Sequence, residues 1–185
     1  ILFGLVCSHM CIRDIYEGAR HGKVLPLFIL DDGTAGEYTM GSASRWWLHH
    51  SLASLNNSFG GNLSFYLGNP LDVLCDIVTR FDINAIYWNR CYEPWRIDRD
   101  AKIKEHLKKK INVESFNGSL LWEPWTIIKD DGTHYKVFTP FYRKGCLQAE
   151  QPRESIPKPG NVKYLRDNDG SVKLNQLKLL PFICW

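Results

Sequence analysis

The sequence lacks the motifs by which most nucleotide-binding enzymes hold phosphate groups. It has neither the GxGxxG loop of dinucleotide-binding domains nor the GxxxxGK[ST] loop of nucleoside triphosphatases. Tight phosphate binding by either route is therefore excluded. The adjacent pair His49 and His50 falls on a predicted helix, where neighbouring side chains diverge and cannot share one metal ion.

Cysteine is present but not in a metal-binding or cross-linking pattern. The six cysteines are scattered, with no CxxC pair and no histidine at zinc-ligand spacing. A chain of 185 residues can bury its own core, so it needs no disulfide scaffold. This pattern predicts reduced thiols, a cytoplasmic protein and no metal site.

The sequence also lacks a large net charge and long apolar runs. The formal net charge is +3, too small to indicate binding to nucleic acid or to a membrane surface. The apolar run 1–6 is far too short to span a bilayer and is typical of a buried strand instead. The basic run Lys108-Lys109-Lys110 is typical of a solvated helix end.

What the sequence does contain is an alternation of apolar strands and helices. This order predicts an α/β fold, a Rossmann-like doubly wound five-stranded parallel sheet flanked by helices. Ligands of such sheets bind beyond the carboxyl ends of the strands. We expect strands at 1–6, 24–30, 63–67, 85–88 and 113–116, with helices at 42–59, from Pro70 to Phe81, and at about 94–109.

The pattern changes beyond Leu121. The segment 125–138 is predicted to form a hairpin that turns at Asp130-Asp131-Gly132-Thr133. Residues 151–170 are rich in proline, glycine and charge, which indicates a linker. The apolar end 174–185 is expected to be poorly ordered or to fold back over the domain. We therefore predict one α/β domain at 1–150 and an interdomain linker at 151–185.

The stretch 88–100 contains the strongest candidate for a binding site. Asn89, Tyr92 and Glu93 follow a predicted strand and open a helix, beside two tryptophans and several arginines. Such a set could hold a flat heterocycle by stacking and edge hydrogen bonds. Alternatively, Glu93 is only an acid in a first helical turn and the tryptophans pack the core.

Several blocks resemble the DNA photolyase/cryptochrome family, and they occur in the family's order. They lie at 23–32, 43–52, 88–95, 116–121 and 135–141, the last being the most specific. The segment Leu179-Leu180-Pro181 and Trp185 are similar to the end of the family's interdomain linker. The chain is thus identified as resembling the family's N-terminal α/β antenna domain.

The resemblance implies part of a light-driven repair enzyme. In the family, a C-terminal helical domain binds FAD and damaged DNA, and the reduced flavin splits pyrimidine dimers. The N-terminal domain holds an antenna chromophore: methenyltetrahydrofolate, a deazaflavin or a flavin. By resemblance, Glu93 is the antenna anchor, with Asn89 and Tyr92 beside it. We expect the helical FAD domain to be absent here and the chain to be inactive alone.

One segment departs from the family pattern. The family's first βα loop is similar to Trp-Phe-Arg-x-Asp-Leu-Arg, followed by Asp-Asn-Pro. Within 4–15 of this chain, only Arg13-Asp14 matches. The departure puts antenna binding in question. Two further interpretations therefore stay open: a stand-alone pterin- or flavin-binding module, and a cryptochrome-type signalling fragment that contacts protein partners.

Overall fold

The structure is a computed structural model that describes residues 2–5 and 12–181, with side chains from residue 12 onward. It divides into two compact units, which are described separately. The first unit comprises Ile1–Gly118 together with Lys158–Trp185, and the second comprises Ser119–Pro157. The predicted boundary at residue 150 stays a prediction.

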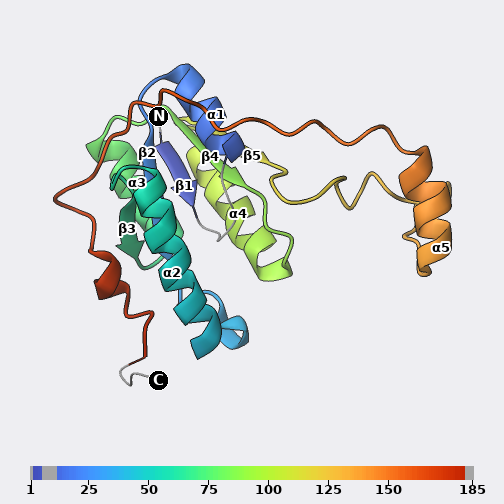
Figure 1. Cartoon of the computed structure of the whole chain (residues 1–185), viewed down its shortest axis with the longest axis horizontal. Helices are drawn as coiled ribbons and strands as arrows, with labels where there is room; N and C mark the ends of the chain where they lie inside the picture. Colours follow the sequence, from blue (N-terminus) through green and yellow to red (C-terminus); the bar gives the residue numbers. More distant parts are fainter. Residues whose placement is uncertain (1, 6–11, 182–185) are drawn as a thin grey trace. The chain divides into compact units, whose positions relative to one another are not determined.

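The first unit is built on parallel strands in the order β3-β2-β1-β4-β5 (Figure 1). Every pair of neighbouring strands runs in the same direction, so all carboxyl ends lie at one edge. The α/β class with parallel strands is thereby confirmed. The strands are β1 (Leu2–Leu5), β2 (Leu25–Leu30), β3 (Ser64–Leu67), β4 (Ala85–Asn89) and β5 (Asn112–Phe116).

Helices connect the strands and supply apolar cover. They are α1 (Ile12–His21), α2 (Ser42–Ser58), α3 (Pro70–Arg80) and α4 (Pro94–Leu107), with a short 3₁₀ turn η1 (Gly36–Tyr38) after β2. The predicted start of α3 is confirmed, because Pro70 stands at its first turn and the Asn69 side chain accepts from the Leu71 N–H at 2.9 Å. The helix at 94–109 was predicted two residues too long.

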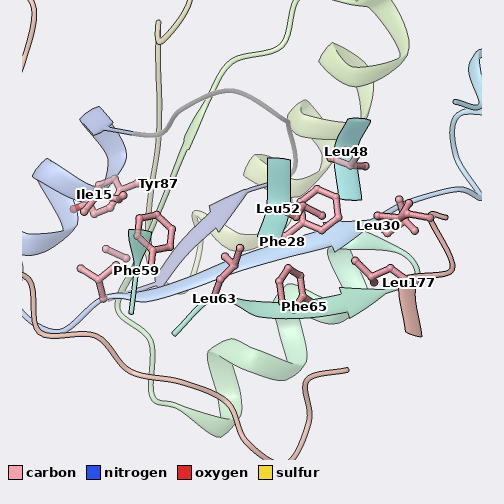
Figure 2. Packing of buried hydrophobic residues seen from close by; sticks show 13 residues of the cluster. Ile15, Phe28, Leu30, Leu48, Leu52, Phe59, Leu63, Phe65, Tyr87 and Leu177 are labelled. Atoms are coloured by element: carbon pink, nitrogen blue, oxygen red, sulfur yellow. The ribbon is translucent and has the colours of Figure 1, made fainter. Parts of the chain in front are cut away.

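Two apolar clusters divide the side chains of the sheet. Alternate residues of β2 belong to different clusters: Phe28 and Leu30 to one, Leu27 and Ile29 to the other. The first cluster also contains Leu48 and Leu52 of α2 (Figure 2). The second contains residues of α3 and α4, namely Leu74, Ile77, Ile103 and Leu107. Cover on both faces explains why β2 is apolar at every position.

Only part of the predicted first strand and of the segment after it falls on residues that the structure describes. Leu2–Leu5 forms β1, as expected within 1–6. The helix α1 begins at Ile12, so residues 12–15 are helical rather than part of a loop. The remainder of the altered segment, residues 6–11, lies outside the described residues.

The second unit corrects the predicted hairpin. The turn is present: the Lys129 N–H donates to the Thr133 carbonyl at 2.9 Å, and Gly132 has a φ of +77° that suits glycine. However, no strand occurs among its residues, so the hairpin is wrong. An isolated two-stranded ribbon is marginal without a third strand to cover it. The helical segments of the second unit are α5 (Phe138–Pro140), η2 (Phe141–Gly145) and η3 (Cys146–Gln148).

Residues 158–181, here called the strap, return to the first unit. Tyr164 forms a parallel bridge with Val24, and Val172 an antiparallel bridge with Phe65 on β3. The turn η4 (Leu174–Leu177) follows, and both Leu177 and Leu179 are buried in the first cluster. The described part of the apolar end, residues 174–181, thus folds back over the α/β unit, which is one of the two predicted outcomes, and residues 182–185 lie outside the described residues.

A buried carboxylate fixes the strap to the sheet. Asp167 is 2% exposed and accepts from the Tyr66 hydroxyl and from Arg80 Nη2, both at 2.7 Å. The Gly170 N–H donates to its other oxygen at 2.8 Å. Burial would raise the pKa of Asp167, but the hydrogen bonds from Arg80, Gly170 and Tyr66 hold it at about 2. The carboxylate is therefore charged and fully paired at neutral pH.

We predict that Asp167→Ala destabilises the first unit by about 2–3 kcal/mol, because Tyr66 and Arg80 lose a buried partner. Asp76→Ala is the matched control, since it removes an acid whose side chain is 59% exposed from the same arginine. It should cost less than about 1 kcal/mol. Urea unfolding followed by tryptophan fluorescence measures both. Equal losses in the two variants would contradict the assignment.

Candidate functional site

A pocket opens at the carboxyl end of β2. The cavity volume of the pocket is about 60 Å³, and about 510 Å³ of empty space is present when the open solvent at its mouth is included. The position agrees with the rule that ligands of parallel sheets bind beyond the strand ends. Its walls come from β2 and the loop after it, from α2 and from the first turns of α4: Phe28, Ile29, Leu30, Asp31, Asp32, Ala35, Tyr38, Met40, Leu48, Trp95, Arg96 and Arg99.

Arg99 of α4 lines the pocket and contacts two carboxylates. Its guanidinium donates to Asp100 Oδ1 at 3.0 and 2.8 Å, and Nη1 lies 3.8 Å from Asp31 Oδ2. The indole of Trp88 donates to the other oxygen of Asp100 at 3.1 Å. Burial raises the pKa of Asp100, while Arg99 and Trp88 partly offset the rise. The network holds Arg99 rigidly, because two of its nitrogens are fixed on Asp100.

Trp95 gives the pocket a flat aromatic wall. The guanidinium carbons of Arg96 and Arg99 lie 4.9 and 5.3 Å from the centre of its ring, within cation–π range. These contacts keep the ring from turning freely, so Trp95 has a fixed place in the pocket lining. A planar heterocycle is the kind of ligand that such a wall selects.

The charges at the mouth are balanced. Arg45 of α2 donates to both oxygens of Asp32, at 2.9 and 2.8 Å. Asp31 accepts from the Thr34 N–H at 3.0 Å and from the Thr34 hydroxyl. The pocket therefore offers paired donors and acceptors rather than an excess of either charge. This favours an uncharged ring with polar edges over a bare anion.

The predicted residues Asn89, Tyr92 and Glu93 are absent from the pocket lining drawn from the described residues. Glu93 precedes α4 with a side chain that is 54% exposed, and its Oε1 lies 3.7 Å from Arg96 Nη1. It thus contacts the pocket through Arg96. Tyr92 is half-buried on the same loop. None of the three predicted residues therefore lines the pocket.

Asn89 ends β4 and lies against Gly118. A β-carbon built on Gly118 would come within 2.3 Å of the Asn89 side-chain carbon, so only glycine fits there. The Arg90 N–H donates to the Phe116 carbonyl at 2.8 Å, which keeps the two strand ends together. Asn89 is therefore tightly placed at the carboxyl edge, although away from the pocket lining.

Sequence reasoning missed Asp31 and Arg99 as pocket residues. A signal was available for Asp31, because Asp31-Asp32 directly follows the clearest strand and therefore lies at the ligand edge. Arg99 lies in the stretch 88–100 whose arginines are candidates for holding a flat heterocycle, but the sequence does not single it out, because its neighbours indicate an exposed helix with i, i+4 ion pairs. Its burial depends on the contact between α4 and the end of β2.

These features define an α/β domain with a pocket at the carboxyl edge of parallel strands. The family model described as "DNA photolyase" matches residues 15–160. The chain belongs to the DNA photolyase family. The predicted resemblance is confirmed.

Individual relatives agree. The chain is 34% identical over 164 residues to a deoxyribodipyrimidine photo-lyase of Agrobacterium fabrum, covering 86% of this chain and 33% of that protein. It is 33% identical to cryptochrome-2 of Arabidopsis thaliana, covering 76% of this chain and 24% of that one. The chain thus spans about a third of its relatives' length or less.

Solved structures show the same domain. A class III photolyase from Agrobacterium tumefaciens matches with a TM-score of 0.84 and 30% identity, over 97% of this chain and 38% of that one. An archaeal photolyase from Sulfolobus tokodaii matches with a TM-score of 0.71 and 20% identity, over 98% of this chain and 41% of that one, and shows the fold alone.

Within the described residues, no helix is long and apolar enough to cross a membrane.

We predict that Gly118→Ala displaces Asn89 and destabilises the protein by about 1–3 kcal/mol, because the new methyl group has no room. Gly160→Ala is the control, since nothing lies within 4 Å of its β-carbon position. That change should be neutral or slightly stabilising. Thermal unfolding followed by circular dichroism compares them. A Gly118→Ala protein as stable as the control would show that Asn89 is not confined.

Proposed function

We propose that this chain is the antenna-chromophore domain of a photolyase-type protein and binds a planar pigment in the pocket at the end of β2. The observation that carries the proposal is Trp95 in the pocket lining, with Arg96 and Arg99 at cation–π distance from its ring, beside the acceptor Asp31. An aromatic wall with few fixed polar groups is the usual composition of a cofactor site.

The candidate pigments are methenyltetrahydrofolate, a deazaflavin and a flavin. When bound, the pigment would supply absorption of near-ultraviolet or visible light. Trp95 would stack on its ring, Arg99 Nη1 would donate to a ring carbonyl, and Asp31 would accept from a ring N–H. The pocket is open to solvent, so the part of the pigment that it does not cover would lie at its mouth beside Tyr38.

Glu93 is proposed to anchor the pigment at the rim. Its carboxylate lies beside Arg96, so it can either accept directly from the pigment or hold Arg96 against it. Asn89 and Tyr92 are proposed as weaker contacts for a pigment that reaches beyond Arg96 toward the end of β4.

The activity of the whole protein is a further proposal. The Agrobacterium relative is called a deoxyribodipyrimidine photo-lyase and is about three times as long as the matched part. We propose that residues 1–150 act as the antenna domain and that 151–185 lead toward a helical FAD domain, which would repair pyrimidine dimers in damaged DNA. The similarity to cryptochrome-2 supports a signalling protein as the second candidate. The half-buried thiol of Cys75 and the buried thiol of Cys146 form no disulfide, which supports a reducing, cytoplasmic setting.

Trp95→Ala should weaken pigment binding about tenfold or more, because it removes the stacking surface. The assay is titration of the purified chain with FMN and, separately, with methenyltetrahydrofolate, followed by absorption. Trp125→Ala in the second unit is the control, since that side chain is 57% exposed and outside the pocket. Unchanged affinity in Trp95→Ala for a pigment that the parent chain binds would refute this pocket.

Glu93→Gln should reduce affinity for the same pigment by ten- to a hundredfold, or about 1.5–3 kcal/mol, if the carboxylate is the rim anchor. The change preserves shape while removing the charge. Glu105→Gln, an exposed acid further along α4, is the control and should bind normally. Equal binding by both variants would remove Glu93 from the site while leaving the pocket assignment intact.

A further inference from the structure

Buried polar atoms without partners gather where α1 meets the end of β4. Asp14, in the first turn of α1, is 0% exposed. Neither of its carboxyl oxygens has a hydrogen-bond partner, and the same is true of Asn89 Oδ1. Buried polar atoms are almost always paired, so three unpaired acceptors around one junction require an explanation.

The surroundings of Asp14 oppose a negative charge. Burial raises the pKa of Asp14 from 3.8 to about 8, and its own nearby backbone N–H, the charge of Arg13 and the nearby backbone N–H of Asn89 offset this only in part. The guanidinium of Arg13 lies over the Phe116 ring at 4.9 Å. On β4, burial and the charge of Glu114 raise the pKa of Tyr87, and Glu17 adds a smaller rise. Asp14 is not among the groups that shift the pKa of Tyr87. Among the described charged groups, Arg13 is therefore the one that acts on Asp14.

We propose that Asp14 is a neutral carboxylic acid that donates its O–H to Asn89 Oδ1. One proton resolves both anomalies, because it converts an unpaired acceptor of Asp14 into a donor and gives Asn89 Oδ1 its partner. An ionised Asp14 would instead leave an uncompensated charge in the interior, which costs several kcal/mol.

The pair makes Asp14 a positioning residue for Asn89. With Oδ1 held by Asp14, the amide can offer only its NH₂ group at the carboxyl end of β4. Gly118 confines the same side chain from the other direction, so the amide cannot readily rotate. Any ligand group that meets Asn89 must then be an acceptor, such as a ring carbonyl. This last step rests on the proposed pigment function, whereas the protonation of Asp14 does not.

The test compares the pH dependence of unfolding in the parent chain and in Asp14→Asn, which mimics the neutral acid. The folded state keeps the Asp14 proton up to about pH 8, while the unfolded state loses it near the ordinary value of 3.8. The parent chain must therefore lose stability relative to Asp14→Asn as pH rises from 5 to 8. The unfolding constants should diverge by up to tenfold per pH unit.

Asp98→Asn, which changes an exposed acid on α4, is the control and should follow the parent profile. Parallel profiles for the parent chain and Asp14→Asn would overturn the proposal. Infrared difference spectra of the parent chain give a second measurement: a protonated carboxyl band present at pH 6 should disappear by pH 9. Its absence at pH 6 would also overturn the proposal. Neither measurement uses a pigment, so a failure of the proposed function leaves both results interpretable.

Discussion

The parallel direction of all neighbouring strands is the constraint on which the rest of this protein depends. Parallel strands require long crossovers, and the helices in those crossovers bury the side chains on either side of the sheet. The same direction brings every carboxyl end to one edge. Asp31 after β2, Asn89 at the end of β4 and the first turns of α1 and α4 therefore lie at the same edge of the sheet although they are distant in sequence.

The carboxyl edge contains two polar arrangements with different consequences. Around the pocket, Asp31, Asp32, Arg45 and Arg99 are charged and paired, so they present fixed donors and acceptors to a ligand. At the junction of α1 and β4, the carboxyl oxygens of Asp14 and the Oδ1 atom of Asn89 are buried without hydrogen-bond partners, which supports the neutral pair proposed above. The first arrangement is suited to recognition, and the second to holding the end of β4 in place.

The strap connects the pocket to the far end of the chain. Its Asp167 is fixed by Tyr66 and Arg80, and its Leu177 and Leu179 share a cluster with Phe28, Leu30 and Leu48, which line the pocket. Removing the strap would therefore expose the back of the pocket wall. Composition indicates only a linker for 151–170, because one buried aspartate among exposed and half-buried residues leaves no periodic pattern in a sequence.

Much of the fold could be predicted because local and long-range signals agree. The apolar run of β2, the Asn69-Pro70 start of α3 and the stripe of Leu48 and Leu52 on α2 each encode their own environment. The hairpin at 125–138 failed because a turn signal does not supply the strand that must cover it. The pocket could be predicted only in part, because Arg99 reaches it through a contact with Asp31, which is distant in sequence and follows β2.

The central claim is that a flat pigment binds against Trp95 at the end of β2. Indole N–H signals in a nuclear magnetic resonance titration of the chain with FMN and with methenyltetrahydrofolate test it most directly. The account predicts that one of these pigments shifts the Trp95 signal strongly and leaves those of Trp122 and Trp125 unchanged. Saturable binding of either pigment without any shift of Trp95 would contradict it.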